Sequence, residues 1–120
     1  MARLLVHIVT GPENPTRAAL GLFVARTALG AGHEVDLFLA GDAVGLLRPA
    51  TLDAGVGIGT GSMREHVEAL VAGGARFHAS GMSSKARGLS PESLGGLAVK
   101  MAPPEVLIEL TFAADRVLTY

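Results

Sequence analysis

The stretch Phe77–Ser90 reads FHASGMSSKARGLS, and the arrangement of the other segments follows from it. Its first residues complete a predicted strand, and Gly81 then turns the chain into a short helical run that ends at Gly88. This run is rich in hydroxyl side chains and contains two cations, Lys85 and Arg87. Backbone N–H groups at the start of a helix attract negative charge, so the stretch predicts an anion site where a strand ends.

The segments before this stretch alternate between strands and helices. Leu4–Val9 is apolar on both faces, as central parallel strands are, and Val35–Ala40 is the second predicted strand. Thr16–Gly30 predicts a helix that is apolar over most of its circumference, and Met63–Ala72 predicts an amphipathic helix. Ala75–Ala79 is the third strand, which continues into the opening stretch.

Residues 41 to 62 are predicted to be less regular. We expect a short helix around Val44–Leu47 that is terminated by Pro49, and then a flexible loop, Thr51–Ser62. Alternating glycines in this loop resemble a dinucleotide-binding fingerprint, but no strand leads directly into them. The loop is therefore interpreted as a flexible segment near the mouth of the site.

The last third of the chain contains two further strands. We expect a loop at Pro91–Ser93, a fourth strand at Leu97–Lys100, a helix at Glu105–Ala113 and a fifth strand at Asp115–Tyr120. The helix should turn Leu107, Leu110 and either Phe112 or Ala114 inward. The alternation predicts one α/β domain, residues 1–120, with a mainly parallel five-stranded sheet and helices on both faces, a flavodoxin-like three-layer sandwich.

Composition limits the classes of function. Apolar residues make up 49% of the chain and charged residues 18%, a balance that predicts a homo-oligomer in which a second copy covers apolar surface. The net charge is -1 and no basic stripe is present, so nucleic acid is not an expected partner. Without a cysteine there is no thiolate chemistry, and without a long apolar segment or a signal peptide we expect a cytoplasmic protein that does not enter the membrane.

Ligands of open parallel sheets bind at the carboxyl ends of the strands. The loops expected at that edge are Thr10–Asn14, Thr60–Ser62 and Ser80–Arg87. The alternative to an anion site is that Lys85 and Arg87 are ordinary solvated side chains at the surface. The candidate ligand-binding residues are Thr10, Gly11, Glu13, Asn14, Ser80, Gly81, Ser83, Ser84, Lys85 and Arg87.

Histidine side chains can act in catalysis or bind metals. His78 and Ser80 share one strand face, so they are candidates for a general base and a nucleophile, although no third group is evident to orient the imidazole. His7 and His78 lie in strands that can be neighbours at the centre of the sheet. No pair of histidines has the spacing of metal ligands, so neither a metal nor another cofactor is expected.

Four motifs together resemble the DsrE/DsrF-like family of small α/β proteins of sulfur relay, over essentially the whole chain. They are Thr10-Gly11-Pro12, Gly32-His33-Glu34-Val35, Ala75-Arg76-Phe77 leading into Ser80-Gly81-Met82-Ser83 with Lys85, Arg87 and Gly88, and Ala114-Asp115-Arg116-Val117-Leu118-Thr119. The resemblance implies a five-stranded sheet with flanking helices and a homo-oligomer, often a trimer or a hexamer. In members that handle sulfur, a cysteine in the loop after the third strand carries a persulfide.

This sequence departs from the family at that cysteine, because the aligned position is Ser80, to within one residue. A serine hydroxyl cannot hold a transferable sulfur as a thiolate does. The leading hypothesis is a homo-oligomer, with a trimer favoured over a hexamer, that binds a small anionic or sulfur-containing ligand or a partner protein. The alternatives are a hydrolase or transferase that uses Ser80 and His78, and an oligomeric scaffold without catalysis.

Overall fold

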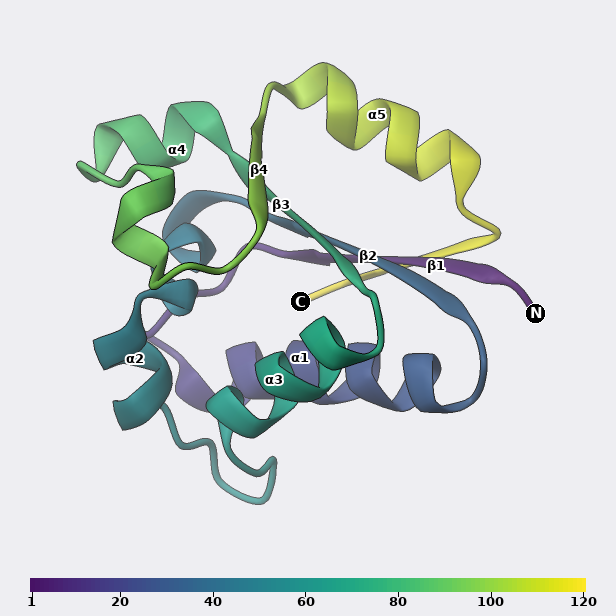
Figure 1. Ribbon diagram of the computed structural model, residues 1–120, viewed down its shortest axis with the longest axis horizontal. Helices are drawn as coiled ribbons and strands as arrows, with labels where there is room; N and C mark the ends of the chain where they lie inside the picture. Colours follow the sequence, from purple (N-terminus) through teal and green to yellow (C-terminus); the bar gives the residue numbers. More distant parts are fainter.

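Parallel strands form the centre of the protein, and the computed structural model describes residues 1–120 (Figure 1). The sheet order is β4-β3-β2-β1-β5, and every neighbouring pair is parallel. The predicted α/β class is therefore confirmed. The strands are β1 Arg3–Ile8, β2 Glu34–Leu39, β3 Arg76–Ser80, β4 Val99–Ala102 and β5 Arg116–Thr119.

The first face of the sheet is covered by α1, Pro15–Gly30, and α3, Met63–Ala72, which pack against each other. Successive side chains of a strand point to opposite faces, so alternate residues of each strand enter this layer. They form the larger of two apolar clusters, whose fully buried members include Val6, Ile8, Leu22, Leu37, Leu39 and Leu70.

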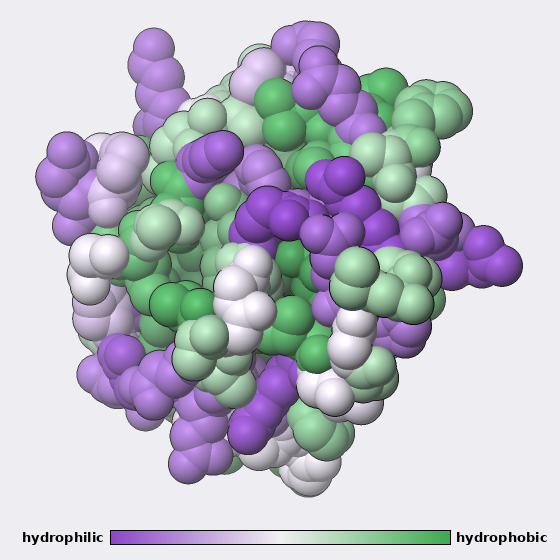
Figure 2. Space-filling model, turned by 45° about the vertical axis from the view of Figure 1, so that its right-hand side comes forward, coloured by the Kyte–Doolittle hydropathy of each residue, from purple (hydrophilic) through white to green (hydrophobic).

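The opposite face is covered by α5, Pro104–Ala113. The connection from β4 to β5 crosses the sheet in the direction opposite to the earlier connections, and right-handed crossovers then place its helix on the other face. A smaller cluster of Leu5, Phe38, Ala102 and Leu110 fills this interface. Figure 2 shows apolar side chains at the surface along the upper part of the molecule, where α5 lies.

The segment after β2 is more helical than expected. Gly41–Leu47 forms a 3₁₀ helix, η1, which ends just before Pro49 as predicted. Pro49–Ala54 forms a further helix, α2, where a loop was expected from Thr51. The backbone N–H at the first position of a helix has no partner within the helix, so proline, which has no N–H, loses nothing there. The fixed φ of proline also suits that position. Pro49 therefore begins a helix, and the first residues of the predicted loop belong to it.

The last third of the chain differs in detail from the prediction. The fourth strand begins two residues later than expected, because Gly95 and Gly96 have left-handed φ values of 63° and 84° and extend the turn. Pro91–Leu94 forms a 3₁₀ helix, η2, where a loop was expected, and the short helix after Gly81 is α4, Gly81–Ala86. Of the two inward candidates at the end of α5, Ala114 packs on the smaller cluster and Phe112 is 85% exposed.

A buried carboxylate joins the three central strands. The side chain of Asp36 in β2 is 2% exposed, and it accepts hydrogen bonds from Arg3 Nε of β1 at 2.9 Å and from Arg76 Nε of β3 at 2.6 Å. Burial acts to raise the pKa of Asp36, but the hydrogen bonds and charges of Arg76 and Arg3 outweigh it and hold the pKa below its usual value. The two ion pairs of Asp36 therefore stabilise the fold while its carboxylate is ionised.

We expect Asp36→Asn to lower the free energy of unfolding at pH 7 by about 3 kcal/mol, because it removes the charge that compensates the two arginines. The folded-state pKa of Asp36 is depressed, so its contribution is fully present above the unfolded pKa and is lost as the pH falls through the folded value. Urea unfolding should accordingly show a difference between the two proteins that shrinks below about pH 4.

Asp53→Asn is the matched control, because Asp53 forms an ion pair with Arg64 but its side chain is 65% exposed. This change should cost less than about 1 kcal/mol at any pH. Equal effects of the two substitutions at pH 7 would contradict the structural role of Asp36.

Candidate functional site

Three connections meet at the carboxyl edge of the sheet, and a close backbone contact packs the first against the second. A Cβ atom added to Gly11, after β1, would lie 2.2 Å from the carbonyl oxygen of Asp42, at the start of η1. Only glycine permits this approach. The same loop leads into α1, where Asn14 Oδ1 accepts a hydrogen bond from Arg17 N at 3.1 Å and caps the helix.

The hydroxyl groups after β3 make structural hydrogen bonds. Ser80 Oγ accepts a hydrogen bond from Ser83 N at 3.1 Å and caps α4, and Ser83 Oγ accepts one from Gly41 N at 2.9 Å. These bonds join the connection after β3 to the connection after β2. Ser84 is 2% exposed, and its Oγ has no hydrogen-bond partner. Two of the three candidate hydroxyl ligands that follow β3 are thus already engaged as acceptors within the protein.

A charged cavity of about 330 Å³ lies beside these connections. Arg87 donates from Nη2 to Asp42 Oδ1 at 3.0 Å and from Nη1 to Ser83 O at 3.0 Å, so its charge is already paired. Arg48 is exposed and takes part in none of the ion pairs. The residues that line the cavity are Pro12, Glu13, Asp42, Gly45, Arg48, Arg87 and Leu89.

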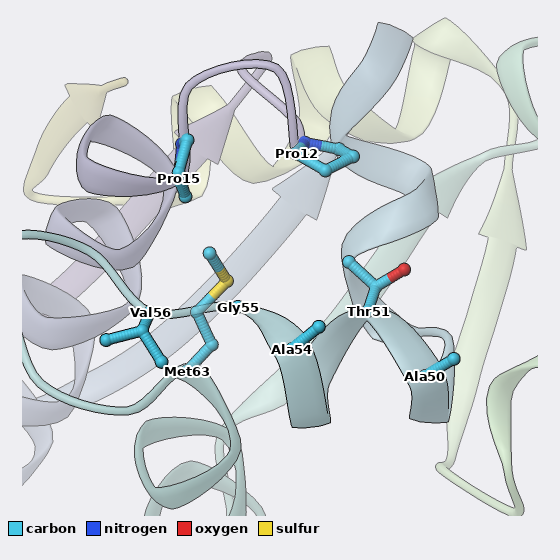
Figure 3. Close-up of a pocket in the computed structure, with 8 residues that line it drawn as sticks. All are labelled: Pro12, Pro15, Ala50, Thr51, Ala54, Gly55, Val56 and Met63. Atoms are coloured by element: carbon cyan, nitrogen blue, oxygen red, sulfur yellow. The ribbon is translucent and has the colours of Figure 1, made fainter.

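An apolar cavity of about 370 Å³ lies next to the charged one, and Pro12 lines both. Figure 3 shows its walls: Pro12 of the loop after β1 and Pro15 at the start of α1 stand on one side, α2 lies on another, and the side chain of Met63 projects between them. Val56 belongs to the glycine-rich loop, so this loop borders the apolar cavity. The lining residues are Pro12, Pro15, Ala50, Thr51, Ala54, Gly55, Val56 and Met63.

The glycine-rich loop is held at several points. Ile58 N donates to Thr16 Oγ1 at 3.1 Å, which fastens the loop to the start of α1. His66 of α3 is buried, with Nε2 2.6 Å from Thr60 O and Nδ1 3.3 Å from an Arg26 nitrogen. Because the carbonyl can only accept, His66 carries its proton on Nε2. The imidazole therefore anchors the end of the loop.

The structure separates the predicted site residues into groups. Glu13 and Arg87 line the charged cavity, whereas Lys85 is exposed and lines neither cavity of the carboxyl edge. Two residues were not anticipated: Arg48 and Asp42 both line the charged cavity. The rule that ligands bind beyond strand ends could have indicated Asp42, which closely follows β2, but Arg48 approaches the edge only through the intervening η1 helix.

Ser80 and His78 are not hydrogen-bonded to each other. His78 is 7% exposed and its Nδ1 lies 3.3 Å from Leu37 O, while the Ser80 hydroxyl caps α4. His7 and His78 are not on neighbouring strands either, because β2 lies between them and the Phe38 ring separates their imidazoles by centroid distances of 6.0 and 6.4 Å. Burial lowers the pKa of His7. No three His, Asp or Glu side chains are grouped as metal ligands would be.

A model of the DsrE/DsrF-like family matches residues 3–120. The chain belongs to the DsrE/DsrF-like family. Solved structures share the fold: the ychN protein from E. coli superposes with a TM-score of 0.80 at 22% identity, with 100% of both chains covered.

Two other structures resemble this DsrE-like protein in fold. A conserved protein of unknown function from Bacteroides thetaiotaomicron, BT1422, has a TM-score of 0.73 and 14% identity, with 99% of this chain and 95% of that chain covered. A protein of unknown function from Methanobacterium thermoautotrophicum, MTH1491, has a TM-score of 0.73 and 17% identity, with 100% of both chains covered. No curated protein matches the sequence. None of the helices combines the length and apolar character needed to cross a bilayer.

We expect Ser80→Cys to create a reactive thiol in this DsrE-like protein, and the wild type to accept no sulfur from a polysulfide donor. The Ser80 position is half-buried at the start of α4, and a thiolate there can accept the hydrogen bond that Ser83 N now donates. The thiol pKa should therefore fall below the ~8.5 of a free cysteine. Mass spectrometry after donor treatment should show added sulfur on the variant alone.

Ala79→Cys provides the control, since Ala79 is 1% exposed in the larger apolar cluster and its thiol should stay unmodified. Sulfur bound to Ala79→Cys but not to Ser80→Cys would show that the accessible position has been misassigned.

Proposed function

We propose that this DsrE-like protein binds a small monoanionic ligand with an apolar body at the carboxyl edge of the sheet, without cysteine-based sulfur transfer. The observation that carries the proposal is the unpaired Arg48 in a charged cavity that shares Pro12 with an apolar cavity. A ligand in both cavities would place its anionic group near Arg48 and its apolar part against Met63 and Val56. Binding sites commonly combine an apolar lining with a few polar groups in this way.

The charge balance of the cavity favours one negative charge on the ligand. Arg87 is paired with Asp42, which leaves Arg48 and Glu13 as the other charged side chains. Arg48 can therefore offset one negative charge, and a second negative charge on the ligand would meet repulsion from Glu13. A carboxylate or a sulfonate therefore suits the cavity better than a doubly charged phosphate.

Hydrolysis or group transfer by Ser80 and His78 is less well supported. A serine nucleophile needs a base that accepts its proton, and Ser80 Oγ is hydrogen-bonded to Ser83 N instead of to His78. Moreover, Ser80 lines neither cavity of the carboxyl edge. We therefore propose a binding protein.

We expect Arg48→Gln to weaken binding of hexanoate about tenfold, because it removes the charge-assisted hydrogen bond to the carboxylate. Ala54→Phe should also weaken hexanoate binding, since the ring would fill the apolar cavity. Acetate, which lacks the apolar part, should bind the wild type more weakly than hexanoate. Isothermal titration calorimetry measures all of these affinities.

Lys85→Gln is the matched control for Arg48→Gln, because both remove one exposed cation near the carboxyl edge and only Arg48 lines the charged cavity. Loss of hexanoate binding in Lys85→Gln with unchanged binding in Arg48→Gln would move the ligand to α4 and contradict the proposal.

We further propose that the protein forms a homo-oligomer, with a trimer as the favoured state. Large apolar side chains are exposed on two helices: Leu20 and Phe23 on α1 are 38% and 43% exposed, and Ile108 and Phe112 on α5 are 55% and 85% exposed. Exposed apolar side chains on helices of a small protein are typical of surfaces that another copy covers. The family resemblance supports the same expectation.

Light scattering coupled to size-exclusion chromatography should report a multiple of the 12.3 kDa chain mass, and three chains for the trimer. A stable contact of this kind buries about 1,200 Å² or more, so the assembly should persist at micromolar concentration. A monomer across the whole concentration range would rule the assembly out.

A further inference from the structure

A third cavity, of about 320 Å³, lies away from the carboxyl edge and shares no residue with the two cavities there. It is formed at the first halves of β3 and β4, and its lining residues are Ala75, Arg76, Phe77, His78, Ala98, Val99 and Lys100. His78 and Lys100 are partners in the β3–β4 register, and Arg76 lies two residues before His78. All three side chains therefore stand on the α5 face of the sheet.

The path of α5 explains why this part of the sheet is open. The helix begins after the end of β4 and must reach the start of β5, on the far side of β1. It consequently runs obliquely toward the amino-terminal end of the sheet and contacts β4 and β1 (Figure 1). The first halves of β3 and β4 lie outside this path, and the cavity occupies that place.

His78 presents one ring nitrogen that the protein does not use. The residue is 7% exposed, and its Nδ1 lies 3.3 Å from the carbonyl oxygen of Leu37, which can only accept a hydrogen bond. Nδ1 therefore carries a proton. Nε2 makes no hydrogen bond within the protein, so a ligand in the cavity can donate to it when it is neutral or accept from it when it is protonated.

The charges around the cavity leave one cation without a partner. Arg76 is committed to Asp36 through Nε at 2.6 Å and Nη2 at 3.1 Å, and its Nη1 lies 3.7 Å from Glu34. Arg3 compensates the second oxygen of Asp36. Lys100 is exposed on the edge strand and belongs to no ion pair. Arg3, Arg76 and Lys100 outnumber Asp36 and Glu34, and the surplus positive charge is located at Lys100.

We propose that this cavity is a phosphate site, in which Lys100 Nζ and His78 Nε2 hold the oxygens of a phosphate group. Phosphate suits the pair because it offers several strong acceptors around one centre, and because the anion or the imidazole can supply the proton between Nε2 and oxygen. The site does not depend on the ligand proposed for the carboxyl edge. An exposed lysine on an edge strand can also act only to prevent pairing with another strand, and the experiment separates the two roles.

The test is a titration of the wild-type protein with inorganic phosphate, followed by long-range ¹H–¹⁵N NMR of the histidine rings. We expect the His78 Nε2 resonance to shift with phosphate, and Lys100→Gln to weaken that response about tenfold, as loss of one charge-assisted hydrogen bond implies. Lys100→Arg should retain most of the affinity. Arg48→Gln and Lys85→Gln should titrate as the wild type does, which distinguishes this site from the carboxyl edge.

Glycerol phosphate in a parallel titration identifies the source of the group. Tighter binding than inorganic phosphate assigns the site to a phosphate monoester, and equal or weaker binding assigns it to the free ion. The proposal is overturned if the His78 ring does not respond to either compound, if Lys100→Gln titrates like the wild type, or if Arg48→Gln abolishes the response. Lys100 is exposed at the sheet edge, so its variants should fold as the wild type does.

Discussion

The buried charge of Asp36 is the constraint on which the arrangement of the sheet depends. One carboxylate in β2 is shared by an arginine from each neighbouring strand, so β1, β2 and β3 are held together by a polar contact as well as by backbone hydrogen bonds. A slip of one residue would turn Asp36 to the opposite face, into the larger apolar cluster. The contact therefore specifies a single register, and that register brings the connections after the three strands to one edge, where the charged and apolar cavities form.

Much of this architecture could be predicted from local patterns. The apolar strands, the amphipathic helix Met63–Ala72 and the alternation of elements follow from periodicity and were placed within a few residues. The position of β5 beside β1 does not, because it depends on how the whole chain crosses the sheet. The helix α2 was not anticipated, because proline can both follow the end of one helix and begin the next, and only the first of these roles was predicted for Pro49.

The site was harder to predict than the fold. Hydroxyls and cations after β3 suggested an anion cradle, but Ser80 and Ser83 complete the hydrogen bonding of the backbone and Arg87 is held by Asp42. No sequence motif marks Arg48 as a site residue. It lines the charged cavity together with Glu13 only because η1 and α2 fold on either side of it. In this DsrE-like chain the Ser80 side chain acts as a helix cap at the start of α4. A short polar side chain meets that requirement.

Pro12 stands between the charged and the apolar cavity and lines both. Its ring fixes φ, and the neighbouring Gly11 is pressed against the backbone of Asp42, so this partition cannot easily rotate aside. A molecule that fills both cavities has to pass around the rigid Pro12 ring. Whether the ligand fits then depends on the distance between its anionic end and its apolar end. Selection among ligands would accordingly depend on molecular length as well as on the charge of the anionic group.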